Sequence, residues 1–388
     1  MKAFEKIIAL CAVTALLAVI LPLSGSACAE EDAVRQRMQS MTLREKVGQL
    51  FMVRPDALEA RFSPDDLENN KITGTTEVTA EMRARYAQYP CGGFAIFRKN
   101  ILSPDQLTAL TGSLHQLNDL TPLLGIDEEG GSIARIANHP AGFGVRKFPS
   151  MGSIADTGDP EQACEAGRVI GAYLRDYGFD IDFAPVADVN TNPLNTVIGN
   201  RAFGSNPEAA AQMVSAYIRG LHENGILSCV KHYPGHGDTA TDTHTGYAET
   251  LKPWDEISRC EMVTFQAGIA EGTELVMTAH IAAPNVTGSN IPATMSHILL
   301  TEKLRGELGF QGLIVTDALG MGAIRSQYTS SEACIACLKA GVDLLLMPYD
   351  YMEAFDGVMA AIEAGDLSEE RIDESVYRIL KIKFSKNF

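Results

Sequence analysis

Short runs of almost continuously apolar residues recur along the chain and alternate with longer stretches in which apolar residues return every three or four positions. A run that is apolar at nearly every position is typical of a parallel strand covered on both faces, whereas the longer spacing predicts an amphipathic helix. Eight runs predict strands, at 49–53, 93–97, 123–127, 179–186, 226–231, 275–280, 313–317 and 342–347.

The helical stretches between these runs carry the expected end signals. Those at 161–178, 206–225 and 296–310 have a glycine at or next to their last position, which is common where a helix ends. Strands alternating with helices in this number predict an α/β fold, a single (β/α)8 barrel of the TIM type, with an open doubly wound sheet as the alternative. The segment 54–90 is polar and irregular, and no linker or repeat divides the chain. We therefore expect an insertion on the rim of one catalytic domain at 30–388.

The N-terminus has the pattern of a secretory signal. Lys2 and Lys6 precede an apolar run at 7–23, and small residues follow, including Ala27-Cys28-Ala29. A basic start, an apolar centre and a small-residue cleavage site predict a signal peptide at 1–29 and export to the periplasm or beyond. Cys28 also occupies the position of a lipoprotein cysteine, and an uncleaved anchor is a third interpretation. Membrane attachment is expected only through such a segment.

Composition narrows the function classes. Apolar residues make up 46% of the 388 positions, enough for a sizeable core, and the formal charge is −17. A surface with this much negative charge repels phosphate groups, so we do not expect nucleic acid as a partner. The cysteines beyond the signal show no paired zinc-ligand spacing, so we interpret most of them as buried apolar residues, although an exported chain has the option of disulfides. They are Cys91, Cys164, Cys229, Cys260, Cys334 and Cys337.

Polar residues end or follow several of the predicted strands. In a (β/α)8 barrel the carboxyl ends of all strands meet at one face, and the chemistry lies there. We therefore expect these side chains to converge on a single site. They are Asp127, Asp182, Asp188, Lys231, His232, His280 and Asp317.

The most unusual segment is "KHYPGHGDTATDTHTGY" at 231–247. Its glycines do not have the spacing of a phosphate-binding loop. A zinc site would use His232, His236 and His244 with an aspartate, but the segment lacks the helical spacing typical of such ligands. A third interpretation makes Asp242 the orienting partner of His244, which then serves as general acid and base. A fourth has these histidines only tying down a loop.

The same segment resembles the signature loop of NagZ-type β-N-acetylglucosaminidases in glycoside hydrolase family 3. Four other segments resemble that family in the same order along the chain: "GIDEEGGSIARI", "IGNRAFG", "LIVTDALGMGAI" and "RIDESVYRILKIKF". The resemblance extends from about residue 43 to the C-terminus. It departs from many relatives at Ser132, where they carry arginine, and at Ala318, where they carry a second aspartate. The signal sequence is a further departure.

The resemblance implies roles for individual residues. Asp317 would be the nucleophile, and His244, paired with Asp242, the acid and base. A retaining glycosidase needs a carboxylate on one face of the sugar and a proton donor on the other, and these residue types meet that need. Neither a metal nor a cofactor is implied. The residues expected to bind the substrate are Asp127, Arg135, Arg201, Lys231 and His232.

The expected reaction is exo-hydrolysis of a terminal non-reducing β-linked N-acetylglucosamine from peptidoglycan fragments or chitooligosaccharides, as in peptidoglycan recycling. The resemblance ends near the last residue, which leaves no room for the sandwich domain of the family's β-glucosidases and favours the one-domain enzyme. Alternatives are a β-N-acetylglucosaminide phosphorylase, a β-glucosidase of the same family, a metal-dependent hydrolase, and an exported sugar-binding protein without activity.

Overall fold

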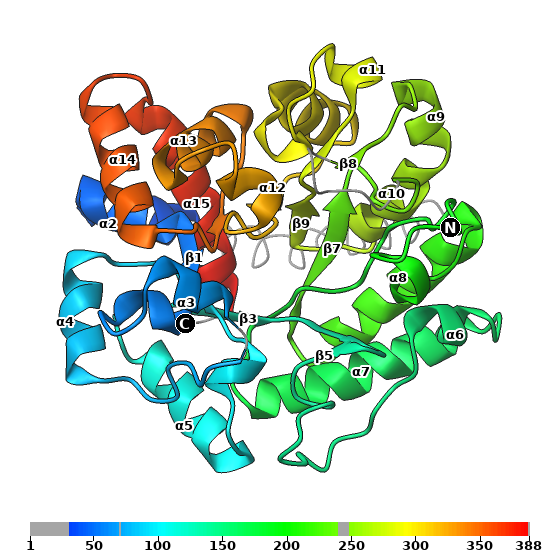
Figure 1. Cartoon of the computed structure of the whole chain (residues 1–388), viewed down its shortest axis with the longest axis horizontal. Coiled ribbons are helices and arrows are strands. Elements are labelled where there is room, and N and C mark those ends of the chain that lie inside the picture. Colours follow the sequence, from blue (N-terminus) through cyan, green and yellow to red (C-terminus); the bar gives the residue numbers. More distant parts are fainter. Residues whose placement is uncertain (1–30, 70, 240–247, 387–388) are drawn as a thin grey trace, which may run out of the picture.

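The computed structural model describes residues 31–69, 71–239 and 248–386. Within these ranges one parallel sheet of eight strands runs in the order β11-β9-β7-β6-β3-β2-β1-β12 (Figure 1). A parallel bridge between Val315 and Leu344 joins the two edge strands and closes the barrel. The predicted (β/α)8 fold is therefore confirmed, and the open doubly wound sheet is wrong.

Each predicted apolar run matches one strand of the barrel, although the strand at 227–233 extends two residues past its run. The strands are β1 (Phe51–Val53), β2 (Gly93–Ala95), β3 (Leu123–Ile126), β6 (Ile181–Asp182), β7 (Leu227–Tyr233), β9 (Leu275–Thr278), β11 (Leu313–Thr316) and β12 (Leu345–Leu346). All residues of these strands are buried, because one face packs inside the barrel and the other against the helices. Two small sheets lie outside the barrel: β4 (Glu128–Gly130) with β5 (Ile133–Ala134), and β8 (Ala248–Glu249) with β10 (Ile281–Ala282).

Helices follow the strands and surround them, as Figure 1 shows. Those before β6 are α2 (Leu43–Gln49), α3 (Pro64–Glu68), α4 (Ala80–Gln88), α5 (Pro104–His115), α6 (Met151–Ala155) and α7 (Pro160–Asp176). The next are α8 (Pro207–His222), α9 (Trp254–Arg259), α10 (Glu261–Ala270), α11 (Pro284–Thr287) and a π-helix at Ile298–Glu307. The last are α12 (Gly322–Arg325), α13 (Ser330–Ala340), α14 (Tyr351–Glu363) and α15 (Glu369–Ser385).

Local sequence accounts for these helices and their packing. In α8, for example, the Asn206 side chain accepts from the amide of Ala209 and Pro207 takes a position that needs no amide hydrogen, which favours a helix start. Glycine then allows α7 and α8 to approach closely, because a Cβ at Gly220 would lie 2.1 Å from the carbonyl oxygen of Cys164. Both helices match predicted amphipathic stretches.

The segment 54–90 is more regular than its composition predicts. Residues 80–88 form α4, which begins at the Thr79 cap and buries Met82 and Tyr86, so the prediction of irregular structure is wrong there. The polar composition reflects the exposed face of this short helix. The preceding residues form a short 3-10 turn and α3 near the barrel rim.

Two predictions concern the termini and the cysteines. Residues 1–30, including Cys28, lie outside the described residues, and no described helix is long and apolar enough to span a membrane. The six cysteines after residue 30 are all unpaired, and five of them are buried. Their interpretation as buried apolar residues is thus confirmed except at Cys260, which is partly exposed.

Candidate active site

Six of the predicted site residues line one cavity at the carboxyl ends of the strands, whereas Asp182, Asp188 and His280, which were also expected to converge there, are buried and do not line it. The cavity has a volume of about 340 Å³ and a wall built from loops after most of the barrel strands. This is the end of the barrel at which the fold places chemistry. Its lining includes the predicted residues Asp127, Arg135, Arg201, Lys231, His232 and Asp317.

Asp127 is the centre of an ion-pair cluster on one wall. Lys231 Nζ, at the end of β7, lies 2.9 Å from Asp127 Oδ1, and Arg135 Nη2 lies 3.2 Å from Oδ2. Burial opposes ionisation of Asp127, but the charges of Lys231 and Arg135 outweigh it and hold the pKa of the carboxyl well below its usual value. The cluster therefore presents fixed donors and acceptors at the cavity wall, which suits recognition of sugar hydroxyls.

Glu129 completes this cluster and was not singled out from the sequence. Its carboxylate lies 2.6 Å from Lys231 Nζ and accepts from Arg201 Nε at 2.9 Å and from Arg201 Nη2 at 2.7 Å. Burial works against the charged form, but Lys231 and Arg201 keep the pKa of Glu129 below its usual value. The only signal for it was a second acidic residue close after the predicted third strand.

Asp188, one of the polar residues expected near the site, orients His232. Asp188 is fully buried, and its Oδ2 lies 2.7 Å from His232 Nδ1 while Oδ1 accepts from the amide of His236 at 2.6 Å. A carboxylate on one ring nitrogen leaves the other, Nε2, to face a ligand. The sequence marked Asp188 only as a polar residue near a strand end. It holds both histidines at the start of the 231–247 segment.

Asp317 follows β11 and lines the cavity from the opposite side. Its amide donates to the carbonyl of Thr278, and its Oδ1 accepts from the amide of Ala318 at 2.7 Å. In the closed strand order, β11 is four strands away from β3 in either direction. Asp317 and Asp127 therefore face each other across the barrel with the cavity between them.

His280 lies behind the loop that follows β11. Its Nδ1 is 2.9 Å from Thr294 Oγ1, and its Nε2 is 2.9 Å from the carbonyl oxygen of Ala318. Burial lowers the pKa of His280, although the Asp317 charge works in the opposite direction. The ring supports the backbone next to Asp317 and does not line the cavity.

Asp242 and His244 lie outside the described residues. The described flanks of their segment are firmly held: Thr239 Oγ1 is 2.7 Å from His236 Nδ1, and residues after the segment form β8. Among the described residues, no group of three or more His, Cys, Asp or Glu side chains is arranged to hold a metal ion. The zinc interpretation also uses His244 and so falls partly outside these residues.

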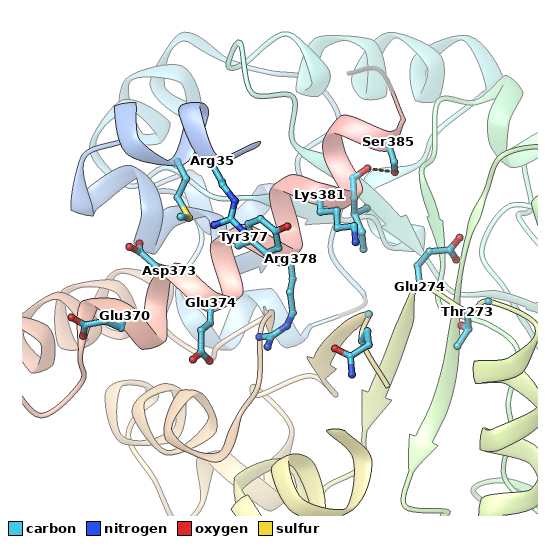
Figure 2. Close-up of a pocket in the computed structure, with 15 residues that line it drawn as sticks. Arg35, Thr273, Glu274, Glu370, Asp373, Glu374, Tyr377, Arg378, Lys381 and Ser385 are labelled. Carbon is cyan, nitrogen blue, oxygen red and sulfur yellow. Dashed lines mark hydrogen bonds between the residues drawn. The ribbon is translucent and has the colours of Figure 1, made fainter. Parts of the chain in front are cut away.

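A larger cavity of about 780 Å³ lies at the other end of the barrel (Figure 2). Its wall includes residues just before β9 and β11, among them Thr273 and Glu274, and the side chains of Glu374, Arg378 and Lys381 from α15. None of the predicted site residues lines it. The amino ends of barrel strands serve stability more than catalysis, so size alone does not identify the active site.

Solved structures resemble this fold closely. A glycoside hydrolase family 3 β-N-acetylglucosaminidase from Paenibacillus sp. str. FPU-7 is 36% identical, with a TM-score of 0.81 over 90% of this chain and 63% of that one. LpqI from Mycobacterium tuberculosis is 28% identical, with a TM-score of 0.74 over 88% of this chain and 94% of that one. The β-glucoside phosphorylase BglX is 26% identical, with a TM-score of 0.78 over 92% of this chain and 60% of that one.

Curated relatives point the same way. Beta-hexosaminidase A of Pseudoalteromonas piscicida is 35% identical over 79% of this chain, but the match spans only 56% of that relative's length. The beta-hexosaminidase of Stenotrophomonas maltophilia strain R551-3 is 34% identical over 76% of this chain and 86% of its own. The model of the glycosyl hydrolase family 3 N-terminal domain matches residues 42–382. Because that match covers most of the sequence, the chain belongs to glycosyl hydrolase family 3.

Proposed function

We propose that this chain is an exo-acting, retaining β-N-acetylglucosaminidase that uses Asp317 as its nucleophile. The observation that carries the proposal is the placement of Asp317 and the Asp127–Lys231–Arg135 cluster on opposite walls of one cavity. A relative named β-N-acetylglucosaminidase shares the fold at 36% identity, and relatives named beta-hexosaminidase share the sequence. The substrates we propose are peptidoglycan fragments and chitooligosaccharides.

The cavity supports an exo mode of action. Its volume of about 340 Å³ is near the lower limit of typical ligand pockets, which suits one terminal sugar unit. The ion pairs of Glu129 with Lys231 and Arg201 hold the wall opposite Asp317 rigid, so a hydroxyl bound there meets donors that need no rearrangement. A sugar held against that wall has its anomeric carbon directed toward Asp317.

The proposed chemistry proceeds in two steps. A carboxylate oxygen of Asp317 bonds to the anomeric carbon while the glycosidic bond breaks, and the leaving oxygen takes a proton from His244. Water then attacks the same carbon, His244 accepts its proton, and the Asp317 ester bond breaks. Asp242 would orient and charge the His244 ring throughout.

The decisive experiment is turnover of para-nitrophenyl N-acetyl-β-glucosaminide by the wild type and by Asp317→Asn. We expect the variant to lose at least about a thousandfold in kcat, since a nucleophile acts only in the chemical step. Asp176→Asn is the control, because Asp176 lies on the exposed end of α7 away from the cavity. Retained turnover in Asp317→Asn would refute the proposal, and activity lost to a chelator and restored by zinc would favour the metal-dependent alternative.

The proposed acid role of His244 is tested by comparing two substrates with different leaving groups. An activated aryl glycoside departs with little protonation, whereas a chitooligosaccharide requires a proton donor. We expect His244→Ala to reduce kcat/KM much more for the chitooligosaccharide than for the aryl glycoside. Equal losses on both substrates would contradict the acid role.

A phosphorylase is the second candidate, because the structure of a protein named β-glucoside phosphorylase matches this chain at a TM-score of 0.78. Product analysis with and without inorganic phosphate separates the two: we expect free N-acetylglucosamine in both cases, and its 1-phosphate would favour phosphorolysis. The same assay on the gluco analogue tests the β-glucosidase alternative. We also propose export through residues 1–29, with Cys28 as an acylation site to be tested by metabolic fatty-acid labelling.

A further inference from the structure

Arg54 is a cation of the active-site cavity that the sequence did not predict. It follows β1, its side chain lines the cavity, and only 6% of it is exposed. The guanidinium carbon lies 4.5 Å from the centre of the Phe97 ring, and Nε contacts the sulfur of Met347 at 3.3 Å. The ring contact and the hydrogen bond to the sulfur together hold the planar group in one orientation.

One edge of this guanidinium has no protein acceptor. Nη1 of Arg54 is buried and finds no hydrogen-bond partner among the described residues. A buried donor without an acceptor costs free energy, and such groups are rare in folded proteins unless a ligand completes them. Arg54 lines the cavity, so we infer that a ligand oxygen bound there supplies the missing acceptor.

Glu68 stands beside Arg54 and decides which kind of ligand fits. Its Oε2 lies 3.4 Å from Arg54 Nη2, its side chain is 32% exposed, and it lines the same cavity. The pair is neutral overall, so it does not favour an anion, and the Glu68 carboxylate would repel one. A hydroxyl suits the pair, because it accepts from the guanidinium and donates to the carboxylate.

The position of the pair in the barrel makes it complementary to the cluster already described. In the closed strand order β1 is four strands from β7 in either direction. Arg54, after β1, therefore faces the wall that carries Lys231. A sugar ring that binds Lys231 through one edge would therefore have its opposite edge next to Arg54.

We propose that Arg54 and Glu68 form a second hydroxyl-recognition pair, which binds one hydroxyl of the substrate at the edge opposite Lys231 and contributes to sugar specificity. This inference rests on the proposed function, since it concerns the same cavity. Arg54 and Glu68 belong to the segment 54–90 and are not among the residues implied by the family resemblance.

The test pairs a side-chain truncation with substrate truncations. kcat/KM is measured for the wild type, Arg54→Met and Arg54→Lys on the para-nitrophenyl N-acetyl-β-glucosaminide and on analogues that each lack one ring hydroxyl. The matched control is Arg61→Met, because Arg61 in the same segment also stacks on a phenylalanine, Phe62, and pairs with a glutamate, but does not line the cavity. Urea unfolding of each variant verifies the fold.

We expect Arg54→Met to lower kcat/KM on the parent substrate about tenfold to a hundredfold, the range for a hydrogen bond to a charged group. For one deoxy analogue, the kcat/KM of the wild type should fall by a similar factor relative to the parent substrate. The kcat/KM of Arg54→Met should be nearly the same on that analogue as on the parent, because the substitution and the missing hydroxyl remove the same hydrogen bond. Arg54→Lys should be intermediate, since it keeps the charge but not the planar fork. Arg61→Met should stay within about twofold of the wild type.

Two results would overturn the inference. One is a kcat/KM of Arg54→Met equal to that of the wild type. The other is that, for every analogue, the loss from the missing hydroxyl multiplies with the loss from Arg54→Met, which would indicate that Arg54 only positions other groups. Failure of the proposed function is distinguished by the wild type, which would then hydrolyse no N-acetylglucosaminide. In that case calorimetric binding of N-acetylglucosamine and its deoxy analogues replaces turnover. Binding that is absent, or independent of Arg54, then refutes the pair, and binding coupled to one hydroxyl supports it.

Discussion

Glu129→Gln is the sharpest test of the charged wall of the cavity. The substitution keeps the shape of the side chain but removes a negative charge that is 2% exposed and is shared by Lys231 and Arg201. The amide nitrogen of glutamine donates, so one of the two cations loses its acceptor. Removing one partner of a buried ion pair costs about 3–5 kcal/mol, because the remaining charge stays buried without compensation.

The assay is urea unfolding of the wild type, Glu129→Gln and the control Glu165→Gln. Glu165 also forms ion pairs with two arginines, with Arg146 at 2.9 Å and with Arg168, but its side chain is 33% exposed. Water replaces the lost contacts there, so the control should lose less than about 1 kcal/mol. Equal losses in the two variants would refute the claim that the buried cluster is an important source of stability.

The pH dependence gives a second check with a definite sign. The pKa of Glu129 in the folded chain lies below its usual value, since Lys231 and Arg201 outweigh the effect of burial. Its contribution is therefore complete above the unfolded pKa of about 4.3 and is lost as the pH falls toward the folded value. The stability gap between wild type and Glu129→Gln should narrow below about pH 4. A gap that widens on acidification would contradict the assignment.

Other predictions concern the framework. Burial lowers the pKa of Lys383 to about 7, so the unfolded chain binds more protons than the folded one from about pH 7 to 10. The free energy of unfolding of the wild type relative to Lys383→Met should rise by roughly 2–4 kcal/mol over that range, and a flat difference would exclude the shift. Gly237→Ala should destabilise by more than about 1 kcal/mol, because its Cβ would lie 2.0 Å from the Val189 carbonyl oxygen. Gly112→Ala, in the open middle of α5, should stabilise by about 0.5–1 kcal/mol, and a thermal unfolding series compares the two.

The barrel was predictable because its signal is local. A strand buried on both faces needs apolar residues at nearly every position, and seven of the eight barrel strands lie inside such a run, while β7 extends two residues past its own. The convergence of Asp127, Lys231 and Asp317 was predictable for a related reason, since parallel strands bring their carboxyl ends to one face. The helical content of 80–88 was missed because a short helix with one buried face has a mostly polar composition.

The partners of the site residues were beyond reach of the sequence. Glu129 and Arg54 are ordinary charged residues in one dimension, and nothing in their neighbours along the chain reveals a cation or a cavity nearby. Asp188 was expected near the site, but its pairing with the His232 ring was not predicted. Their roles arise when barrel closure brings β1, β3 and β7 around one space. In that space burial removes water, so the stability of each charged side chain depends on the charged and polar groups next to it. The local sequence pattern therefore determines where the strands lie and which residue types follow them. The pairing of buried charges depends on which strands, distant in the sequence, become neighbours in the closed barrel.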